Sequence, residues 1–261
     1  MGAEGHADGT VGKALDILDM VARHGRPLRF SDLLMQADYP KATLYRLVQT
    51  LTNQGMLALD PDQGTYSLGV RLVRLAHAAW AQSSLAPIAR PYLDELAAKT
   101  GETIHLAQMD QGQVLYVDKR NAARPVEMFA QAGKVGPAYC TGVGKAMLAW
   151  LQPEALDRAL ARQSFHRHTD QTLDSPAKLL AELQTIRARG LAFDREEHER
   201  GIICCAVPIL ARSGRAIGAV SVTSTTTRTT LAGLEGQADL IKSIAARIAE
   251  EAESWRFPEP N

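Results

Sequence analysis

The segment 40–53 carries polar side chains of the types that contact nucleic acid. Its apolar residues recur at helical spacing, which predicts a helix with one buried face; they are Leu44, Leu47, Val48 and Leu51. The side chains expected on the opposite face and its flanks are Lys41, Ala42, Thr43, Tyr45, Arg46 and Gln49. Arg and Gln can read base edges in the major groove, and Lys, Thr and Tyr can hold phosphates. The segment therefore predicts a helix that binds DNA; the alternative is a protein-interaction helix with a solvated face.

A second short helix is expected just before this segment. Ser31 is a good N-cap for a helix over 32–37, and a tight turn at 37–40 leads into the helix that would bind DNA. An earlier helix, capped by Thr10 and ending near His24, precedes both. Two short helices joined by a tight turn are typical of a helix-turn-helix.

Two short strands are expected after these helices. The runs at 56–59 and 65–68 flank a turn that contains Pro and Gly, which predicts a β-hairpin. With the hairpin, residues 10–68 predict a winged helix-turn-helix. Residues 69–84 predict a linker helix, whose apolar stripe suits either pairing with another helix or packing against its own domain.

The remainder of the chain, residues 85–255, predicts an α+β domain around an antiparallel sheet. Strands are expected at 102–109, 113–119, 126–130, 202–210 and 215–223. Helices are expected at 86–100, 141–150, 153–162, 176–189 and 231–254.

One face of this sheet is suited to a small polar ligand. Strand alternation places Ser221 and Thr223 on one face of a strand, and Ile202 and Cys204 on one face of another. A surface that mixes small apolar groups with a few hydroxyls is typical of small-molecule pockets.

Three further segments could complete such a pocket. The turn Gly142–Gly144 precedes a helical run, so its backbone N–H groups could hold a carboxylate. Asp194 could accept a hydrogen bond from a ligand hydroxyl, and Met128 and Val143 could supply apolar wall. These features favour a small carboxylate ligand.

Several motifs, in order along residues 10–254, resemble the IclR family of bacterial transcriptional regulators. The segments that carry the resemblance are Tyr39–Leu47, Thr65–Gly69, Cys140–Ala146, Asp194–His198 and Gly201–Ile209. The sequence departs from the family at Asp38, where a Gly is common in the turn. Asp tolerates the left-handed conformation, so the turn is still expected.

The resemblance implies a winged helix-turn-helix, a linker helix and a GAF-like effector-binding domain. It also implies a repressor or activator that binds a partly palindromic operator as a homodimer or tetramer, under the control of a small metabolite such as an organic or sugar acid. We expect a repressor. The positions that match effector contacts in the family are Met128, Gly142, Val143, Asp194, Ile202, Cys204, Ser221 and Thr223; His105 and Ala107 are further candidates.

Composition leaves open two other classes of protein. The 29 basic and 29 acidic residues cancel, so no overall charge draws the chain to nucleic acid or membrane, and no apolar run reaches the roughly 18 residues of a membrane span. Three cysteines suit the reducing cytosol, so a cytoplasmic protein without a membrane partner is expected. The three cysteines, with His105 or His198, could form a thiol enzyme or a metal sensor, but no pair has metal-ligand spacing. An adaptor without a ligand is the other alternative. The expectation is no catalysis, no cofactor and no metal.

Overall fold

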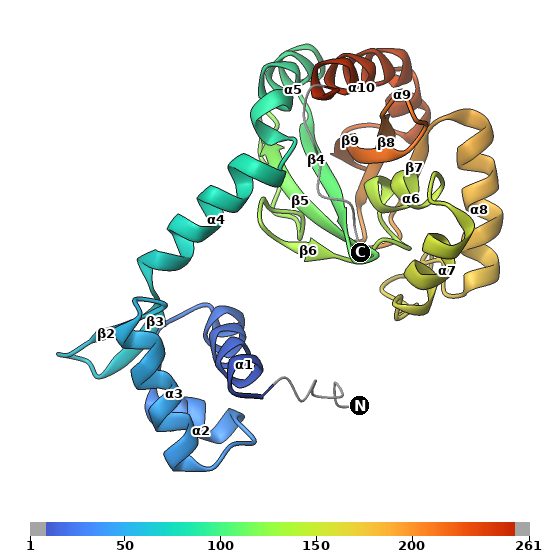
Figure 1. Ribbon diagram of the computed structural model, residues 1–261. Coiled ribbons are helices and arrows are strands. Elements are labelled where there is room, and N and C mark those ends of the chain that lie inside the picture. Colours follow the sequence, from blue (N-terminus) through green and yellow to red (C-terminus); the bar gives the residue numbers. More distant parts are fainter. Residues whose placement is uncertain (1–8, 254–261) are drawn as a thin grey trace. The chain divides into compact units, whose positions relative to one another are not determined.

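The structure is a computed structural model that describes residues 9–253, apart from the side chains of 81–83 (Figure 1). Contacts divide the chain into two compact units, with the boundary between Ala81 and Gln82. Each unit has a hydrophobic core of its own. The expected fold class is confirmed, because a helix-turn-helix with a small sheet precedes a larger domain around an antiparallel sheet.

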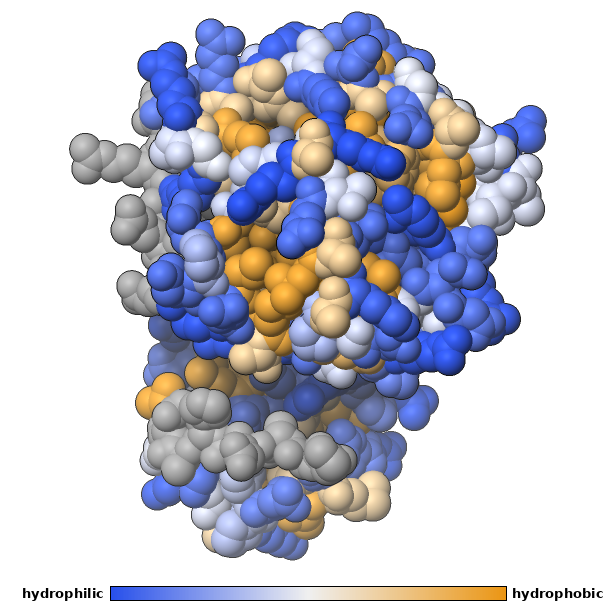
Figure 2. Space-filling view, turned by 90° about the vertical axis from the view of Figure 1, so that its right-hand side faces the viewer, coloured by the Kyte–Doolittle hydropathy of each residue, from blue (hydrophilic) through white to orange (hydrophobic). Residues whose placement is uncertain are grey.

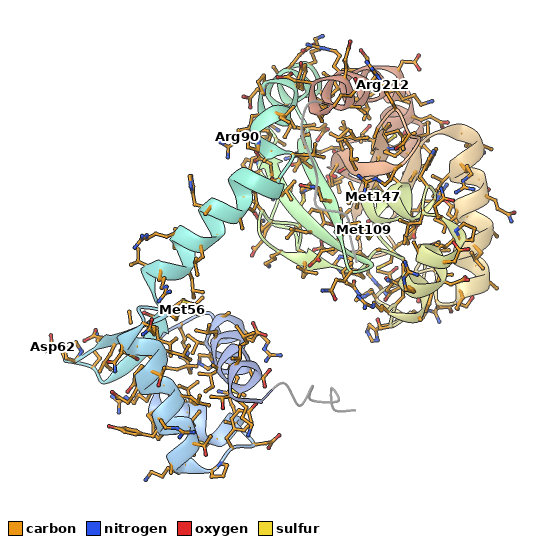
Figure 3. The ribbon with its side chains drawn as sticks, in the orientation of Figure 1. Met56, Asp62, Arg90, Met109, Met147 and Arg212 are labelled. Carbon is orange, nitrogen blue, oxygen red and sulfur yellow. The ribbon has the colours of Figure 1, made fainter. Side chains whose placement is uncertain are left out.

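The first unit is a winged helix-turn-helix followed by a long helix. Its elements are α1 (Gly9–His24), β1 (Leu28–Arg29), α2 (Phe30–Gln36), α3 (Lys41–Asn53), β2 (Leu57–Asp60) and β3 (Thr65–Leu68), and α4 (Val70–Ser83) then carries the chain across the boundary. The apolar stripe of α3 is buried as predicted, in a core that also contains Ile17 and Leu33. Asp62 marks the tip of the β2–β3 hairpin (Figure 3).

The predicted helix caps in this unit are wrong. Helix α1 already includes Gly9, so Thr10 lies within it. Helix α2 begins at Phe30, and its start is closed by the side chain of Asp32, which accepts a hydrogen bond from the Arg29 N–H at 2.9 Å. Ser31 is therefore inside the helix, and the carboxylate closes the first turn in its place.

The second unit contains a six-stranded antiparallel sheet in the order β6-β5-β4-β9-β8-β7. Its strands are β4 (Thr103–Asp110), β5 (Gln113–Arg120), β6 (Val135–Gly136), β7 (Ala192–Arg195), β8 (Ile202–Leu210) and β9 (Ala216–Thr225). Its helices are α5 (Ala86–Thr100), α6 (Gly142–Leu148), α7 (Pro153–Ala161), α8 (Pro176–Arg189), α9 (Leu231–Glu235) and α10 (Ala238–Ala252).

The two faces of this sheet differ in character. One face carries branched aliphatic side chains such as Ile104, Val220 and Val222, and α5 and α10 pack on that side of the sheet (Figure 1). The other face carries small and polar side chains in register: His105 pairs with Ser221, and Ser221 with Ala206. Helix α6 packs on this second face. The side chains of this face that were predicted to bind an effector, such as Ser221, therefore point toward α6.

Two expectations in this unit are wrong, and one strand was not predicted. Residues 126–130 form no strand, because the Phe129 N–H donates to the side chain of Glu199 at 2.9 Å instead of to a neighbouring strand; β6 is the short strand beside β5. The helix expected over 231–254 is divided in two at Gly236 and Gln237. Strand β7 was not expected, since four residues give too short a pattern.

Candidate functional site

Helix α3 presents a polar face to solvent. Lys41, Ala42, Tyr45 and Arg46 are exposed, and Thr43 and Gln49 are half-buried. The Tyr45 ring is held edge-on against Phe30, with the ring centroids 5.8 Å apart. All six residues predicted to contact DNA therefore lie outside the core of the first unit, and their contact with DNA stays a prediction.

A hollow between α6 and the sheet brings together all eight residues predicted to bind an effector. It encloses about 380 Å³ of empty space, part of which is open to solvent. The predicted residues that line it are Met128, Gly142, Val143, Asp194, Ile202, Cys204, Ser221 and Thr223. His105 also lines it, whereas Ala107 packs in the core beside it. We call this hollow the effector pocket.

Sequence reasoning missed several residues of the effector pocket. They are Tyr116, Ala130, Thr141, His198 and Glu199. Tyr116 could have been found by strand alignment, because it stands opposite Ala107 on the neighbouring strand. Glu199 lies in a loop, where no periodic pattern reports which way a side chain points.

Two glycines let α6 approach its neighbours closely. A Cβ atom on Gly142 would lie 2.4 Å from the Cys204 sulfur, and one on Gly144 would lie 2.4 Å from the Ala138 carbonyl oxygen. Real Cβ atoms do not approach other atoms so closely, so any side chain here would push α6 away from the sheet or from the segment before it. The two glycines therefore set the depth of the effector pocket.

A buried ion pair joins α6 to the turn after β7. The Lys145 ammonium donates to Glu197 Oε1, and the side chains of the pair are 0% and 3% exposed. Burial raises the pKa of Glu197, and the charge of Lys145 opposes that rise. The second carboxylate oxygen, Oε2, makes no hydrogen bond to any described residue. The pair adjoins Asp194, which lines the pocket and accepts a hydrogen bond from the Glu197 N–H.

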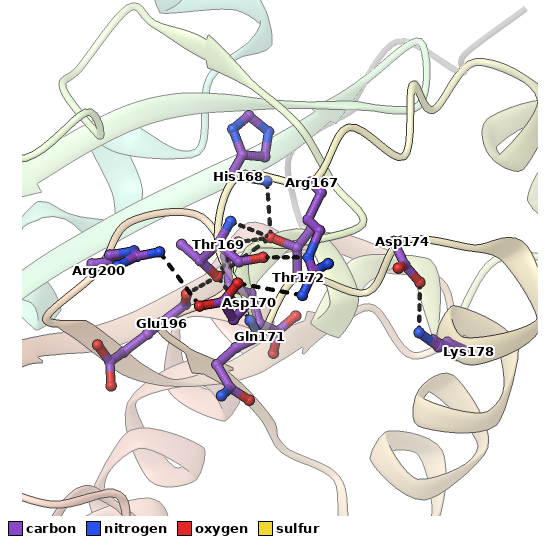
Figure 4. Close-up of polar contacts among 11 residues, drawn as sticks. Arg167, His168, Thr169, Asp170, Gln171, Thr172, Asp174, Lys178, Glu196 and Arg200 are labelled. Atoms are coloured by element: carbon purple, nitrogen blue, oxygen red, sulfur yellow. Dashed lines mark hydrogen bonds and ion pairs between the residues drawn. The ribbon is translucent and has the colours of Figure 1, made fainter.

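A network of hydroxyls fixes the same turn from outside (Figure 4). Thr169 Oγ1 donates to the Glu196 carbonyl and Thr172 Oγ1 to the Glu197 carbonyl, both at 2.6 Å. Arg200 forms an ion pair with Asp170 at 3.4 Å. Because this turn carries His198 and Glu199, the network positions one wall of the effector pocket.

His105 supplies a neutral polar group at the floor of the pocket. Burial, aided by the charge of Lys119, lowers the pKa of His105 to about 3, so the ring is uncharged at neutral pH. Its Nδ1 lies 3.1 Å from Thr223 Oγ1, which in turn lies 3.4 Å from Ser221 Oγ. The Nε2 atom makes no hydrogen bond within residues 9–253. The floor therefore offers a ring nitrogen and hydroxyls to a ligand.

Asp194 lines the pocket and has a carboxyl group whose pKa is strongly raised by its surroundings. Burial, together with the nearby charge of Glu197, raises the pKa of Asp194 to about 7, although Lys145 and the Glu197 N–H oppose the rise. That N–H donates to Asp194 Oδ1 at 2.8 Å. Glu199, by contrast, has a lowered pKa: burial is outweighed by hydrogen bonds from His198 and the Phe129 N–H.

The geometry disfavours thiol chemistry. All three cysteines are buried. Burial raises the pKa of Cys140 and Cys204 well above the usual range and that of Cys205 to about 12, so each is a thiol, whereas the nucleophile is a thiolate. Across the described part of the chain, no three His, Cys, Asp or Glu side chains are grouped to hold a metal ion. No helix there combines the length and apolarity that crossing a membrane requires.

Asp194→Asn should change how stability depends on pH. The folded chain holds a proton on Asp194 up to about pH 7, whereas the unfolded chain releases it near the ordinary value of 3.8. The wild type therefore loses stability as the pH rises through this range, by a few kcal/mol. Asn cannot ionise and keeps an oxygen for the Glu197 N–H. We expect the free energy of unfolding, measured in urea, to shift in favour of the variant between about pH 4 and pH 7. A difference that is constant with pH would contradict the raised pKa.

Two family models match the chain: the IclR helix-turn-helix domain at residues 10–61, and the bacterial transcriptional regulator IclR C-terminal domain at 77–250. The chain is 32% identical to the regulator XynR of Escherichia coli over 84% of this chain and 87% of that protein. It is 30% identical to the E. coli transcriptional repressor IclR, over 84% and 80% respectively.

A solved structure shows the same fold. It is an IclR homologue from Microbacterium hydrocarbonoxydans in complex with 4-hydroxybenzoate, with a TM-score of 0.81, 22% identity, and coverage of 94% of this chain and 100% of that one. The family models together span most of the chain, and the relatives named above are regulators of transcription, not enzymes. The chain belongs to the IclR family of bacterial transcriptional regulators.

Proposed function

We propose that this regulator is a repressor whose binding to its operator is controlled by a small organic or sugar acid held in the effector pocket. The observation that carries the proposal is the convergence on one hollow of the eight residues predicted to bind an effector, which come from distant parts of the chain. Their types are those of a small-molecule site: apolar walls with a few polar groups at defined positions.

The arrangement of polar groups suggests how such an acid is oriented. The first N–H groups of α6, at Gly142 and Val143, have no partner within the helix and belong to residues that line the pocket, so they can donate to a carboxylate bound there. Asp194, when ionised, repels that carboxylate and accepts a ligand hydroxyl instead. The hydroxyls of Ser221 and Thr223 lie across the floor, where they can bind further oxygen atoms.

The DNA partner is a duplex operator with partly palindromic half-sites, bound in the cytoplasm. Two relatives support repression by their names: the E. coli transcriptional repressor IclR and an acetate operon repressor of Salmonella typhimurium. Arg46 and Gln49 are proposed to read bases, and Lys41, Ala42, Thr43 and Tyr45 to contact the backbone or nearby groups.

We further propose that the chain acts as a homodimer, which could pair into a tetramer. Helix α4 leaves Val70 73% and Val73 67% exposed on one face, although Leu72 on the same helix packs into the first core. Apolar side chains so exposed on a helix favour burial against another surface. A dimer would also place two recognition helices on two half-sites, which multiplies the contact with DNA.

Arg46→Ala should weaken binding to the operator by about 1–3 kcal/mol, because it removes a side chain that reads a base edge. The DNA would be a duplex selected by the wild-type chain from a random library, and the affinity would be measured by fluorescence anisotropy at fixed salt. Arg23→Ala, which removes an exposed arginine from α1, is the charge-matched control and should have a smaller effect. Equal effects of the two changes would mean that α3 is not the reading element.

Val73→Asp should shift the chain from dimer to monomer, because a carboxylate in an apolar interface loses its hydration without gaining a partner. Sedimentation equilibrium at micromolar concentration measures the change. Ala78→Asp places the same charge on another side of α4 and should leave the dimer intact. The proposal fails if Val73→Asp sediments as the wild type does.

Ser221→Ala should weaken effector binding about ten- to a hundredfold, because it removes a hydrogen bond to a charged ligand. A panel of pyruvate, succinate, benzoate, 4-hydroxybenzoate and gluconate is first screened by thermal shift, and any ligand found is measured by calorimetry. Ser224→Ala is the matched control, since Ser224 is buried in the same strand but points to the opposite face. Normal affinity in both Ser221→Ala and Asp194→Ala would place the ligand elsewhere.

A further inference from the structure

A second hollow in the same unit lies away from the effector pocket. It encloses about 630 Å³ of empty space, part of it open to solvent, between α7 and the turn that joins β4 to β5. Its apolar wall consists of Met109, Leu151, Ala155 and Ala159, and two arginines, Arg158 and Arg162, complete it. Met109 is labelled in Figure 3, and Figure 2 shows the side of this unit formed by α7 and α8, where apolar surface lies among charged side chains.

The frame of this hollow is fixed by a buried amide. Gln163 is 8% exposed, and its Nε2 donates to the Gly112 carbonyl at 2.7 Å and to the Ala159 carbonyl at 2.9 Å. Its Oε1 accepts a hydrogen bond from the Ala138 N–H at 3.2 Å. Gly112 has a φ of +83°, and a Cβ atom there would lie 3.1 Å from the Ala159 Cα, so the turn packs directly against α7. The hollow is therefore preformed.

The two arginines of the hollow have no acidic partner. Arg158 forms no hydrogen bond or ion pair with any residue in 9–253. Arg162 is oriented by Gln111, whose carbonyl and side-chain oxygens accept from Nη1 at 3.1 and 3.0 Å. Glu154 and Asp157 lie on the same helix, yet neither pairs with these guanidinium groups. Two cations beside an apolar wall thus have unused capacity for an anion.

We infer that this second hollow binds a small amphipathic carboxylate, with its charged group between Arg158 and Arg162 and its apolar body against Met109, Leu151 and Ala155. The apolar wall suits the body of such a ligand, and guanidinium groups match the planar, two-oxygen geometry of a carboxylate. This site is separate from the effector pocket and shares no lining residue with it.

The test uses 4-(trifluoromethyl)benzoate as the probe and the full-length chain, with binding followed by fluorine NMR. We expect saturable binding that Arg158→Gln weakens about five- to tenfold, since exposed charge-assisted hydrogen bonds contribute less than buried ones. The neutral analogue 4-(trifluoromethyl)benzamide should bind more weakly by a similar factor. Ala155→Trp fills the hollow and should abolish binding there, independently of charge.

Two control variants assign the binding to this hollow. Arg189→Gln removes an exposed arginine from α8 and should leave probe binding unchanged. Ser221→Ala alters the effector pocket alone, so probe binding that survives this change belongs to the second hollow, and failure of this inference is distinct from failure of the proposed function. The inference is overturned if the probe shows no saturable binding, if Arg158→Gln and Ala155→Trp both bind it normally, or if Ser221→Ala alone removes binding.

Discussion

The ion pair between Lys145 and Glu197 is the contact on which the geometry of the effector pocket depends. Both charged groups are buried, so each would cost several kcal/mol to hold in the interior without the other. The pair fixes the fully buried helix α6 to the turn after β7, and hydroxyls of Thr169 and Thr172 fix that turn from the other side. Because Asp194 accepts a hydrogen bond from the Glu197 N–H, the pair also determines where a pocket carboxyl lies and how readily it ionises.

The two faces of the sheet in the second unit have different roles: one face contributes to stability, and the other lines the effector pocket. The face toward α5 and α10 buries branched aliphatic side chains, which contribute most hydrophobic free energy per residue. The face toward α6 bears Ala, Ser, Thr and Cys, which contribute less but leave space. The glycines of α6 bring the helix close to this thin layer of side chains. The small side chains on the face toward α6 leave space for the pocket, and the large aliphatic side chains on the opposite face supply the hydrophobic free energy that this space forgoes.

Sequence patterns predicted the elements whose apolar side chains recur at a regular spacing and missed the elements that are too short to show such a spacing. The apolar stripe of α3 and the alternation in β8 and β9 are periodic, so their buried faces could be read directly, and the resemblance to the IclR family indicated residues that converge on one hollow. Strand β6 has two residues and β7 has four, which is too few for a period. The 126–130 segment has the composition of a strand, but the carboxylate of Glu199, distant in sequence, takes its backbone N–H.

The pairing of Lys145 with Glu197 could not be predicted for the same reason. It joins residues 52 positions apart, and neither side chain belongs to a repeating pattern. A lysine in a helical run is normally expected to face solvent. Only the packing of α6 on a sheet of small side chains reveals that this one is enclosed.

The short outer strands also limit how copies of the chain can associate. The sheet ends in the two-residue strand β6 on one side and the four-residue strand β7 on the other, so each outermost strand is short. Strand addition draws its affinity from a row of main-chain hydrogen bonds, and such brief edges supply few of them. Strand addition at β6 or β7 would therefore add little affinity, and an interface between copies of the chain would draw its strength from side-chain surfaces instead.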